Sequence, residues 1–145
     1  MRGRAGFSLI ELMVTIIVMG LLLGFSIPAI NRTLTEYQLV QARRTLVSEI
    51  KLLRQKAISE SRDRRAWFSP SSRYYWFQDP ETMAWKSYLL PPRVMMETVN
   101  FTGGYYDTSI HPDGRSQRAG VIVLRNNLGQ RDTLVVSLSG WVGEP

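Results

Sequence analysis

Gly6-Phe7-Ser8-Leu9-Ile10-Glu11, followed at once by an apolar run to Ile30, is the stretch of sequence that decides the fold. A helix from Phe7 to Ile30 would be roughly 36 Å long, against about 30 Å for the hydrocarbon core of a bilayer. The sequence therefore predicts a membrane-spanning helix. Arg2 and Arg4 precede it without a neighbouring acid, so we expect the first residues to stay in the cytoplasm and the rest of the chain to emerge on the far side.

Glu11 is a carboxylate inside this apolar run. An ionised acid within a bilayer costs about 3 kcal/mol and indicates a functional role. Its natural partner is a cation at the same depth, and cleavage after Gly6 would create one, the amino group of Phe7. A neighbouring, staggered subunit could also supply its own amine. An ordinary secretory signal is instead cleaved after its apolar stretch at a small-x-small site, and the sequence has no clean site of that kind.

Gly6, Phe7 and Glu11, at this spacing, resemble the class III signal of type IV pilins and type II secretion pseudopilins. In that family a prepilin peptidase cuts after the glycine and methylates the exposed phenylalanine, and the glutamate aligns subunits in the filament. Pro28 resembles the family's helix-kinking proline. Because proline removes a backbone donor, we expect the helix to kink or melt near Gly24 to Pro28. The alternative is a plain signal anchor that keeps its leader.

After Asn31 the pattern becomes amphipathic. Apolar residues recur every three or four positions, which predicts a helix that continues to about Asp63 with its apolar stripe against a sheet. The other face carries basic residues, Arg43 and Arg54 among them. We expect that face to be solvated, and the alternative is that it docks anionic lipid or a partner. The recurring apolar residues are Leu39, Ala42, Leu46, Ile50, Leu53 and Ala57.

From Arg65 onward the pattern predicts strands and turns. Two short aromatic strands, at 66–68 and 74–77, are expected to form a hairpin whose aromatic side chains face the core. A further strand is expected within 94–101, and a loop from 103 to 119 with a tight turn at 111–114. The chain should close with an antiparallel hairpin of strands 120–124 and 133–138.

This C-terminal part resembles the globular domain of the H-type (GspH) minor pseudopilins and FimT-like minor pilins. That group has a Pro-Asp-Gly turn before a Gly-x-Ile-x-Leu strand, and a second strand that runs into a Ser-x-x-Gly ending. The matching residues here are Ile110, Pro112, Asp113, Gly114, Gly120, Ile122, Leu124 and Gly140. The resemblance implies a type IV pilin-like α+β fold, in which a long N-terminal helix packs on a small antiparallel β-sheet. The predicted organisation is a leader at 1–6, a transmembrane and assembly helix at 7–30, its amphipathic continuation at 31–63 and an antiparallel β domain at 64–145.

Catalytic chemistry finds little support in the composition. The chain has one histidine and no cysteine, which excludes thiol catalysis and a disulfide framework. His111 stands close to Asp113, with Ser109 and Ser116 nearby, but adjacency in one loop does not make a triad. A metal site could draw on His111, Asp107 and Asp113, which are too few donors for calcium. We expect no enzyme activity, no metal and no cofactor.

Nucleic acid is an alternative partner. Some FimT-like minor pilins bind DNA during natural transformation through a tail of the form Gly-Arg-x-Arg, and here the tail reads Gly140-Trp141-Val142-Gly143. Without those arginines, phosphate contacts would fall to four arginines in or beside the predicted loops. These are Arg115, Arg118, Arg125 and Arg131. The aromatic residues beside Arg65 and Arg73 also suggest stacking on single-stranded nucleic acid, although we prefer a core role for them.

The resemblance as a whole implies a minor pseudopilin or minor pilin subunit, a structural protein that is the substrate of an enzyme. Its expected partners are other pilin subunits, the prepilin peptidase and the inner-membrane assembly platform. The expected location is a single pass of the inner membrane with the β domain in the periplasm, and a filament after assembly. The residues do not distinguish protein secretion from pilus retraction or DNA uptake.

Overall fold

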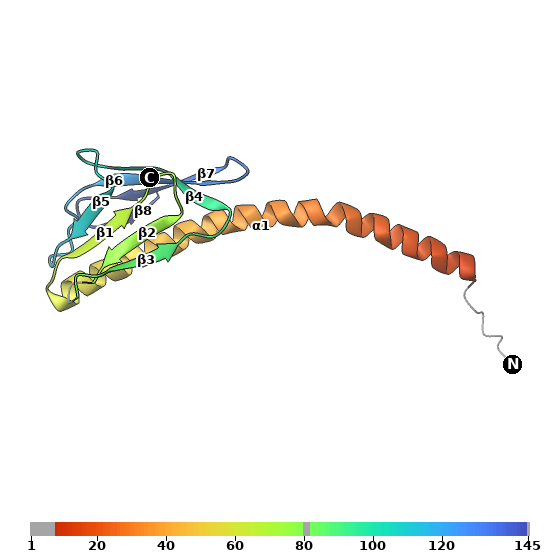
Figure 1. Cartoon of the computed structure of the whole chain (residues 1–145), viewed down its shortest axis with the longest axis horizontal. Helices are drawn as coiled ribbons and strands as arrows, with labels where there is room; N and C mark the ends of the chain where they lie inside the picture. Colours follow the sequence, from red (N-terminus) through yellow and green to blue (C-terminus); the bar gives the residue numbers. More distant parts are fainter. Residues whose placement is uncertain (1–7, 80–81, 145) are drawn as a thin grey trace. The chain divides into compact units, whose positions relative to one another are not determined.

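The structure, a computed structural model, describes residues 8–79 and 82–144, without the side chains of residues 25–29. Within this part of the chain, one helix precedes a series of strands (Figure 1). The chain divides within the helix into two compact units, the first ending at Leu34 and the second beginning at Thr35. The elements are α1 (Leu9–Glu60), β1 (Arg64–Phe68), β2 (Tyr74–Gln78), β3 (Trp85–Leu89), β4 (Val94–Phe101), β5 (Asp107–Ile110), β6 (Gly120–Asn126), β7 (Arg131–Val136) and β8 (Val142–Gly143).

Helix α1 ends at Glu60, three residues before the predicted end near Asp63. Ser61 adopts a left-handed backbone with φ of +52°. The N–H of Arg62 bonds to the carbonyl of Ala57 at 3.2 Å, which is the backbone pattern that commonly ends helices. The apolar periodicity could not reveal this stop, because serine is an unusual residue at that position.

The sequence predicted a kink or melting near Gly24 to Pro28, and the helix does not melt there, because α1 is continuous from Leu9 to Glu60. A proline within a helix removes one backbone hydrogen bond, and the turns on either side of Pro28 retain their helical geometry. The side chain of Pro28 lies outside the described residues.

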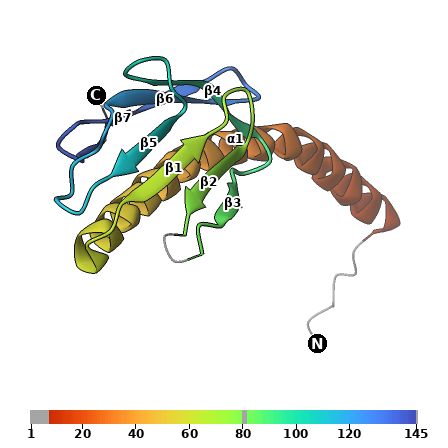
Figure 2. The same cartoon turned by 60° about the vertical axis from the view of Figure 1, so that its left-hand side comes forward.

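The strands form two antiparallel sheets of four strands each. Sheet A has the order β3-β2-β1-β5 and sheet B the order β4-β6-β7-β8. The two sheets are in contact where the turn between β1 and β2 meets β4. The N–H of Ser71 donates to the carbonyl of Met96 at 2.7 Å, and the N–H of Met96 donates to the carbonyl of Ser72 at 2.8 Å. Figures 1 and 2 show β1 and β2 of sheet A lying along the second half of α1. The antiparallel α+β fold expected from the sequence is confirmed.

The core lies between the second half of α1 and the inner faces of both sheets. All six apolar residues that recur along the predicted amphipathic helix are buried. Phe68 of β1 and Phe101 of β4 are fully buried and stack with their ring centroids 5.8 Å apart, so their contact joins the two sheets. Complete burial of such a side chain contributes roughly 1.5–3 kcal/mol. Other buried residues from the sheets are Tyr75, Val94, Met96, Ile110, Ile122, Leu124, Leu134 and Val136.

Several sequence expectations for the β region are confirmed. Strands β1, β2, β4, β6 and β7 lie where strands were predicted, and β6 and β7 form the terminal hairpin. The tight turn at 111–114 is present, since the N–H of Gly114 bonds to the carbonyl of His111 at 2.9 Å. Gly114 has a φ of +79°, a conformation that glycine adopts without steric cost.

Two features of this region differ from the prediction. The segment 103–119 is not all loop, because β5 forms within it and pairs with β1. Its residues lack an alternating apolar pattern, and hydrogen bonds from its polar side chains hold it instead. The first hairpin also does not bury all of its aromatic residues. Tyr75 and Phe77 face the core, while Trp67 and Tyr74 are about half exposed.

Candidate assembly helix and surface sites

Ser8 forms the N-cap of α1. The backbone N–H of Glu11 donates to Ser8 Oγ at 3.3 Å and to the Ser8 carbonyl at 3.1 Å. Thr15 Oγ1 in turn donates to the Glu11 carbonyl at 2.7 Å. Capping by serine satisfies a backbone donor that has no partner within the helix. The sequence carries the signal for this cap, because Ser8 and Glu11 have the Ser-x-x-Glu spacing of a capping box.

Glu11 therefore sits at the third position of the helix, within its first turn. The unpaired N–H groups at a helix N-terminus favour a negative charge within that turn. Gly6 and Phe7, the predicted cleavage and methylation sites, lie outside the described residues.

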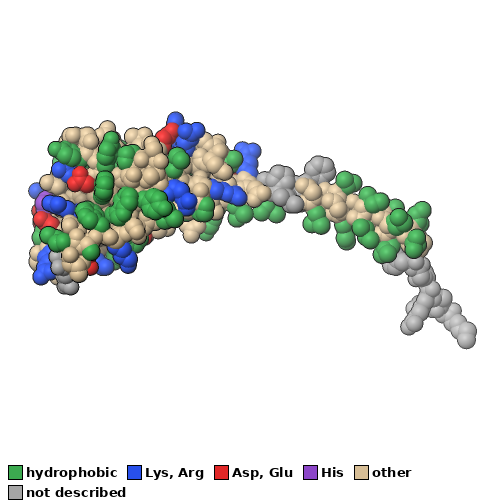
Figure 3. Space-filling model, in the orientation of Figure 1, with side chains coloured by type: hydrophobic (Ala, Val, Ile, Leu, Met, Phe, Trp, Pro, Cys, Tyr) green, Lys and Arg blue, Asp and Glu red, His purple; other side chains and the backbone are tan. Residues whose placement is uncertain are grey.

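The first unit exposes an apolar helix on all sides. From Leu9 to Gly24 every residue of α1 is exposed, and Glu11 is the charged residue among them. Figure 3 shows hydrophobic side chains along this part of the helix. A helix that is apolar on every face is stable only when other helices or lipid cover it. Within the described residues, however, no helix has an uninterrupted stretch long and apolar enough to cross a membrane.

The four arginines proposed for DNA contacts do not gather at one place. Arg115 and Arg118 belong to the loop between β5 and β6, whereas Arg125 and Arg131 face each other near the other end of β6. With a rise of about 3.3 Å per residue, the start of β6 at Gly120 and Arg125 are separated by roughly 16 Å. They therefore form two separate pairs and not a continuous basic stripe.

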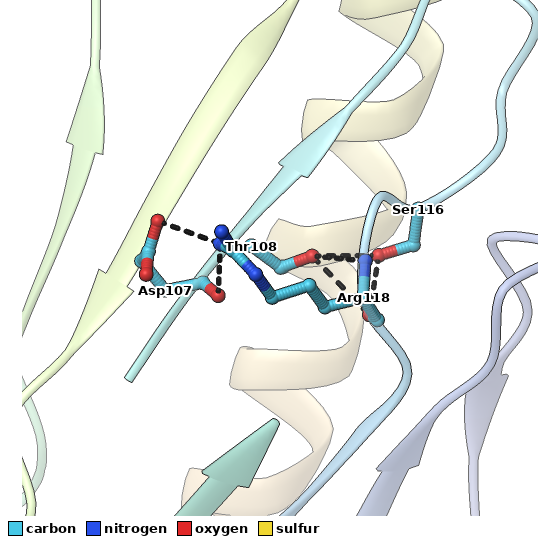
Figure 4. Close-up of polar contacts among 4 residues, drawn as sticks. All are labelled: Asp107, Thr108, Ser116 and Arg118. Atoms are coloured by element: carbon cyan, nitrogen blue, oxygen red, sulfur yellow. Dashed lines mark hydrogen bonds and ion pairs between the residues drawn. The ribbon is translucent and has the colours of Figure 1, made fainter. Parts of the chain in front are cut away.

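Arg118 is fixed by its neighbours (Figure 4). Its Nη1 atom donates to Asp107 Oδ2 at 3.0 Å and to the Asp107 carbonyl at 3.3 Å. Its guanidinium lies 3.9 Å from the centroid of the Tyr105 ring, a cation–π contact. Beneath it, the hydroxyls of Thr108 and Ser116 share a buried 2.8 Å hydrogen bond. These contacts hold the Arg118 side chain in a fixed position.

Arg125 and Arg131 share one acid, Glu97. Arg131 binds it with two hydrogen bonds, Nε to Oε2 at 2.5 Å and Nη2 to Oε1 at 2.8 Å, and Arg125 adds a third at 3.3 Å. The hydrogen bonds from Arg131, together with the charges of both arginines, lower the pKa of Glu97 below its usual value. Glu97 occupies a β-bulge of β4, which turns its side chain toward this pair. Arg115 is exposed.

The C-terminal tail is docked against the second unit. Val142 is buried and pairs with Val136 of β7, and Glu144 forms an ion pair with Arg43 of α1. Arg43 Nε also lies 3.0 Å from Asp132 Oδ2. The basic face of α1 is thus solvated only in part. Arg44, Lys51 and Lys56 are exposed as expected, whereas Arg43 holds the end of the chain and Asp132 of β7 to the helix.

A second such contact brings together α1, the turn at Gly114 and the turn at Gly140. Arg54 Nε donates to the Gly114 carbonyl at 2.9 Å. Gly140 lies so close to that carbonyl that a Cβ atom added to Gly140 would meet the oxygen at 2.0 Å. Two of the three glycines that matched the family outline, Gly114 and Gly140, therefore lie against each other.

His111 does not pair with Asp113. Its Nδ1 atom lies 2.8 Å from Asp63 Oδ1, and both side chains are substantially exposed. Ser116 is buried and bonded to Thr108, so the imagined triad is not assembled. Among the described residues, no group of three or more His, Cys, Asp or Glu side chains could hold a metal ion.

Comparison with known proteins supports the resemblance read from the sequence. The family model for the prokaryotic N-terminal methylation motif matches residues 1–27. No curated protein matches the chain. About three quarters of the chain resembles solved structures of minor pilins and minor pseudopilins, and the chain is pilin-like in fold and in N-terminal signal.

Two of these structures illustrate the similarity. The type IV minor pilin FimU of Pseudomonas aeruginosa aligns with a TM-score of 0.58 and 10% identity, over 76% of this chain and 90% of that chain. The minor pseudopilin EpsH from the type 2 secretion system of Vibrio cholerae aligns with a TM-score of 0.59 and 10% identity, over 74% of this chain and 96% of that chain. At this identity the alignments establish the fold.

Proposed function

We propose that this chain is a minor pilin or minor pseudopilin subunit, a structural component of a filament anchored in the inner membrane. The observation that carries the proposal is the exposed apolar surface of α1 in the first unit. The methylation motif at residues 1–27 coincides with a helix that exposes apolar side chains on every face and carries one acid in its first turn. Such a surface suits burial among copies of the same helix.

The proposed pathway begins with the leader. Prepilin peptidase removes residues 1–6 after Gly6 and methylates the new amino group of Phe7. In sequence the apolar stretch runs from Phe7 to Ile30. Before assembly, this stretch therefore holds the subunit in the inner membrane, with its second unit in the periplasm. The assembly platform then extracts it, and the apolar helix moves from lipid to the filament core.

Glu11 has the role of aligning the subunits in this proposal. Its position in the first turn brings the carboxylate close to where the Phe7 amine of its own chain, or of a neighbour, would lie. In a medium of low dielectric constant an unpaired carboxylate is costly, so a subunit that pairs Glu11 with an amine gains relative to one that does not. This pairing gives the filament a fixed axial stagger. Pro28 lies in the same helix and is proposed to adjust its packing.

The sheets supply partner selection. Their exposed side chains are the surface that a partner would contact. The docked tail and the paired arginines give this surface a fixed shape. Neighbouring pilin subunits are the proposed partners of this surface.

The test is intact-mass and N-terminal analysis of the protein extracted from the membranes of its native cells. A chain that begins at methylated Phe7 supports the pathway. A chain that still begins at Met1, in cells whose prepilin peptidase processes other substrates, contradicts it and supports a plain signal anchor. Deletion of the gene then separates the two machines: lost protein secretion indicates a pseudopilus, and lost pili indicate a pilus.

A further inference from the structure

Sheet A has an aromatic outer face. Because side chains alternate along a strand, the residues between the buried ones on β1 and β2 point away from the core. Trp67 stands opposite Trp76 with ring centroids 5.3 Å apart, and Tyr74 lies 6.0 Å from Trp76. Trp85 of the edge strand β3 extends this row. Figure 3 shows hydrophobic side chains on the side of the molecule where β1 and β2 lie in Figure 1. A group of exposed aromatic side chains on one face is a candidate binding surface.

One end of this face is hollowed into a cleft. Trp67 and Trp85, which are 45% and 44% exposed, line it together with Arg65 and Asp107, and its volume is about 190 Å³. Small-molecule pockets usually measure roughly 300–1,000 Å³. The cleft can therefore hold a single ring, while further rings of a longer ligand would lie over Trp76 and Tyr74.

The polar groups of the cleft are prepared for a ligand. Asp107 is held in place by Arg118, which binds Oδ2 and the backbone carbonyl (Figure 4). Within the described part of the chain, Oδ1 of Asp107 accepts no hydrogen bond, and the guanidinium of Arg65 makes no ion pair. The cleft thus offers a fixed acceptor on one side and free donors on the other.

The chemistry of this cleft selects among ligands. The face of an indole ring is electron-rich, so it attracts the C–H groups on the apolar face of a sugar ring. A carboxylate and a guanidinium are suitable partners for sugar hydroxyls. Arg65 and Arg118 together exceed Asp107 by one positive charge, which complements one acidic group on a ligand. Binding of nucleic acid instead requires several cations along the backbone, and this face lacks them.

We propose that the outer face of sheet A binds an oligosaccharide, with a uronic acid ring between Trp67 and Trp85 and its carboxylate at Arg65. The site goes beyond the proposed role as a filament subunit. It does not depend on processing or assembly, so it can be tested apart from them.

The experiment uses the full chain in detergent micelles and two probes with the same sugar skeleton, tetragalacturonate and its fully methyl-esterified form. Isothermal titration should detect binding of the acid form, weaker for the ester. Trp67→Ala and Trp85→Ala should each weaken binding at least tenfold. Arg65→Gln should lower the affinity for the acid form to that for the ester. Trp141→Ala is the matched control, because Trp141 is 51% exposed but lies just before β8 of the other sheet.

The conservative variant Trp67→Phe guards against misfolding, since it keeps an aromatic ring and should retain part of the affinity. The proposal is overturned if neither probe binds at millimolar concentration. It is also overturned if Trp141→Ala weakens binding as much as Trp67→Ala does. Trp67-dependent binding of oligothymidylate, or Trp67-dependent dimers of the chain in light scattering, without sugar binding, would assign the face to another occupant.

Discussion

The N–H of Glu11 donates to Ser8 Oγ at 3.3 Å, so the residue proposed to align the filament is also part of the cap of α1. Its backbone serves the helix and its carboxylate remains exposed. The two roles can be separated by substitution, because the cap depends on the Ser8 hydroxyl and the backbone of Glu11, whereas alignment depends on a negative charge.

Glu11→Gln should therefore leave cleavage and methylation intact and abolish incorporation into filaments. Glutamine fits the same capping pattern as glutamate but offers no charge to the Phe7 amine. The measurement is the amount of processed protein in sheared filaments relative to that in membranes.

Ser8→Ala is the control for this prediction. It removes about 1 kcal/mol of capping energy and leaves the charge in place, so incorporation should be retained. Normal incorporation of Glu11→Gln, or equal loss in both variants, would contradict a role for the charge.

Leu46→Ala should destabilise the second unit by about 2–5 kcal/mol, because it leaves a cavity between the helix and the sheets. Leu46 is fully buried. Leu52, on the same helix, is 50% exposed, and Leu52→Ala should change stability by less than about 0.5 kcal/mol. Urea unfolding followed by near-ultraviolet circular dichroism measures both. Similar losses for the two variants would mean that the helix packs with a different face.

Removal of the Glu97 carboxylate should flatten the acid side of the stability profile. Its pKa is lowered in the folded chain from 4.5, so its contribution is complete above that value and is lost as the pH falls through the folded pKa. Glu97→Gln should lose stability at pH 7 and show a smaller decline as the pH falls from 7 to below 4.5. Unfolding midpoints across this range test the prediction, and a profile parallel to that of the parent protein would count against it.

Gly140→Ala should be more destabilising than Gly104→Ala. Both glycines have a φ of +76°, but a Cβ atom at Gly104 meets nothing within 4 Å, whereas at Gly140 it meets the Gly114 carbonyl at 2.0 Å. Gly104→Ala should cost about 1–2 kcal/mol for the left-handed backbone. Gly140→Ala adds displacement of the turn that Arg54 holds. Equal unfolding midpoints for the two variants would show that the turns separate freely.

Duplex DNA should bind the full chain no more than weakly and without specificity. Three of the four candidate arginines are paired with Glu97 or Asp107, and affinity from phosphate contacts falls steeply between about 50 and 200 mM salt. Fluorescence anisotropy with a labelled duplex should detect no binding at the upper concentration. Retained binding that Arg115→Glu abolishes would revive the role in DNA uptake.

The sequence predicted those parts of the fold that rest on periodicity. The apolar stripe of α1, from Leu39 to Ala57, and the hairpin of β6 and β7 follow from local patterns, and so does the turn at Gly114. Strand β5 does not follow from a local pattern, because Thr108 and Ser109 are buried by pairing with β1 and by hydrogen bonds to residues of the following loop. Local sequence carries no record of such partners.

The candidate site divides in the same way. The motif at Gly6, Phe7 and Glu11 is read from adjacent residues, whereas the ion pairs of Glu97, Arg125 and Arg131 join three strands. The sequence alone does not show whether an arginine forms an ion pair with an acid from another strand. Four consecutive aromatic residues at 74–77 must occupy both faces of β2, because side chains alternate along a strand. The prediction that they all face the core therefore went beyond the pattern.

The order of the strands has a consequence for how the second unit unfolds. Sheet A takes β1, β2 and β3, then β5, while sheet B takes β4 and then β6 to β8. No single cut in the chain separates the two sheets, because β4 and β5 each lie in sequence among strands of the opposite sheet. Neither sheet can detach while the other keeps its strands in place. The unit should therefore lose its structure in one cooperative step. If a membrane machine pulls on the subunit, the second unit should either stay folded or unfold completely.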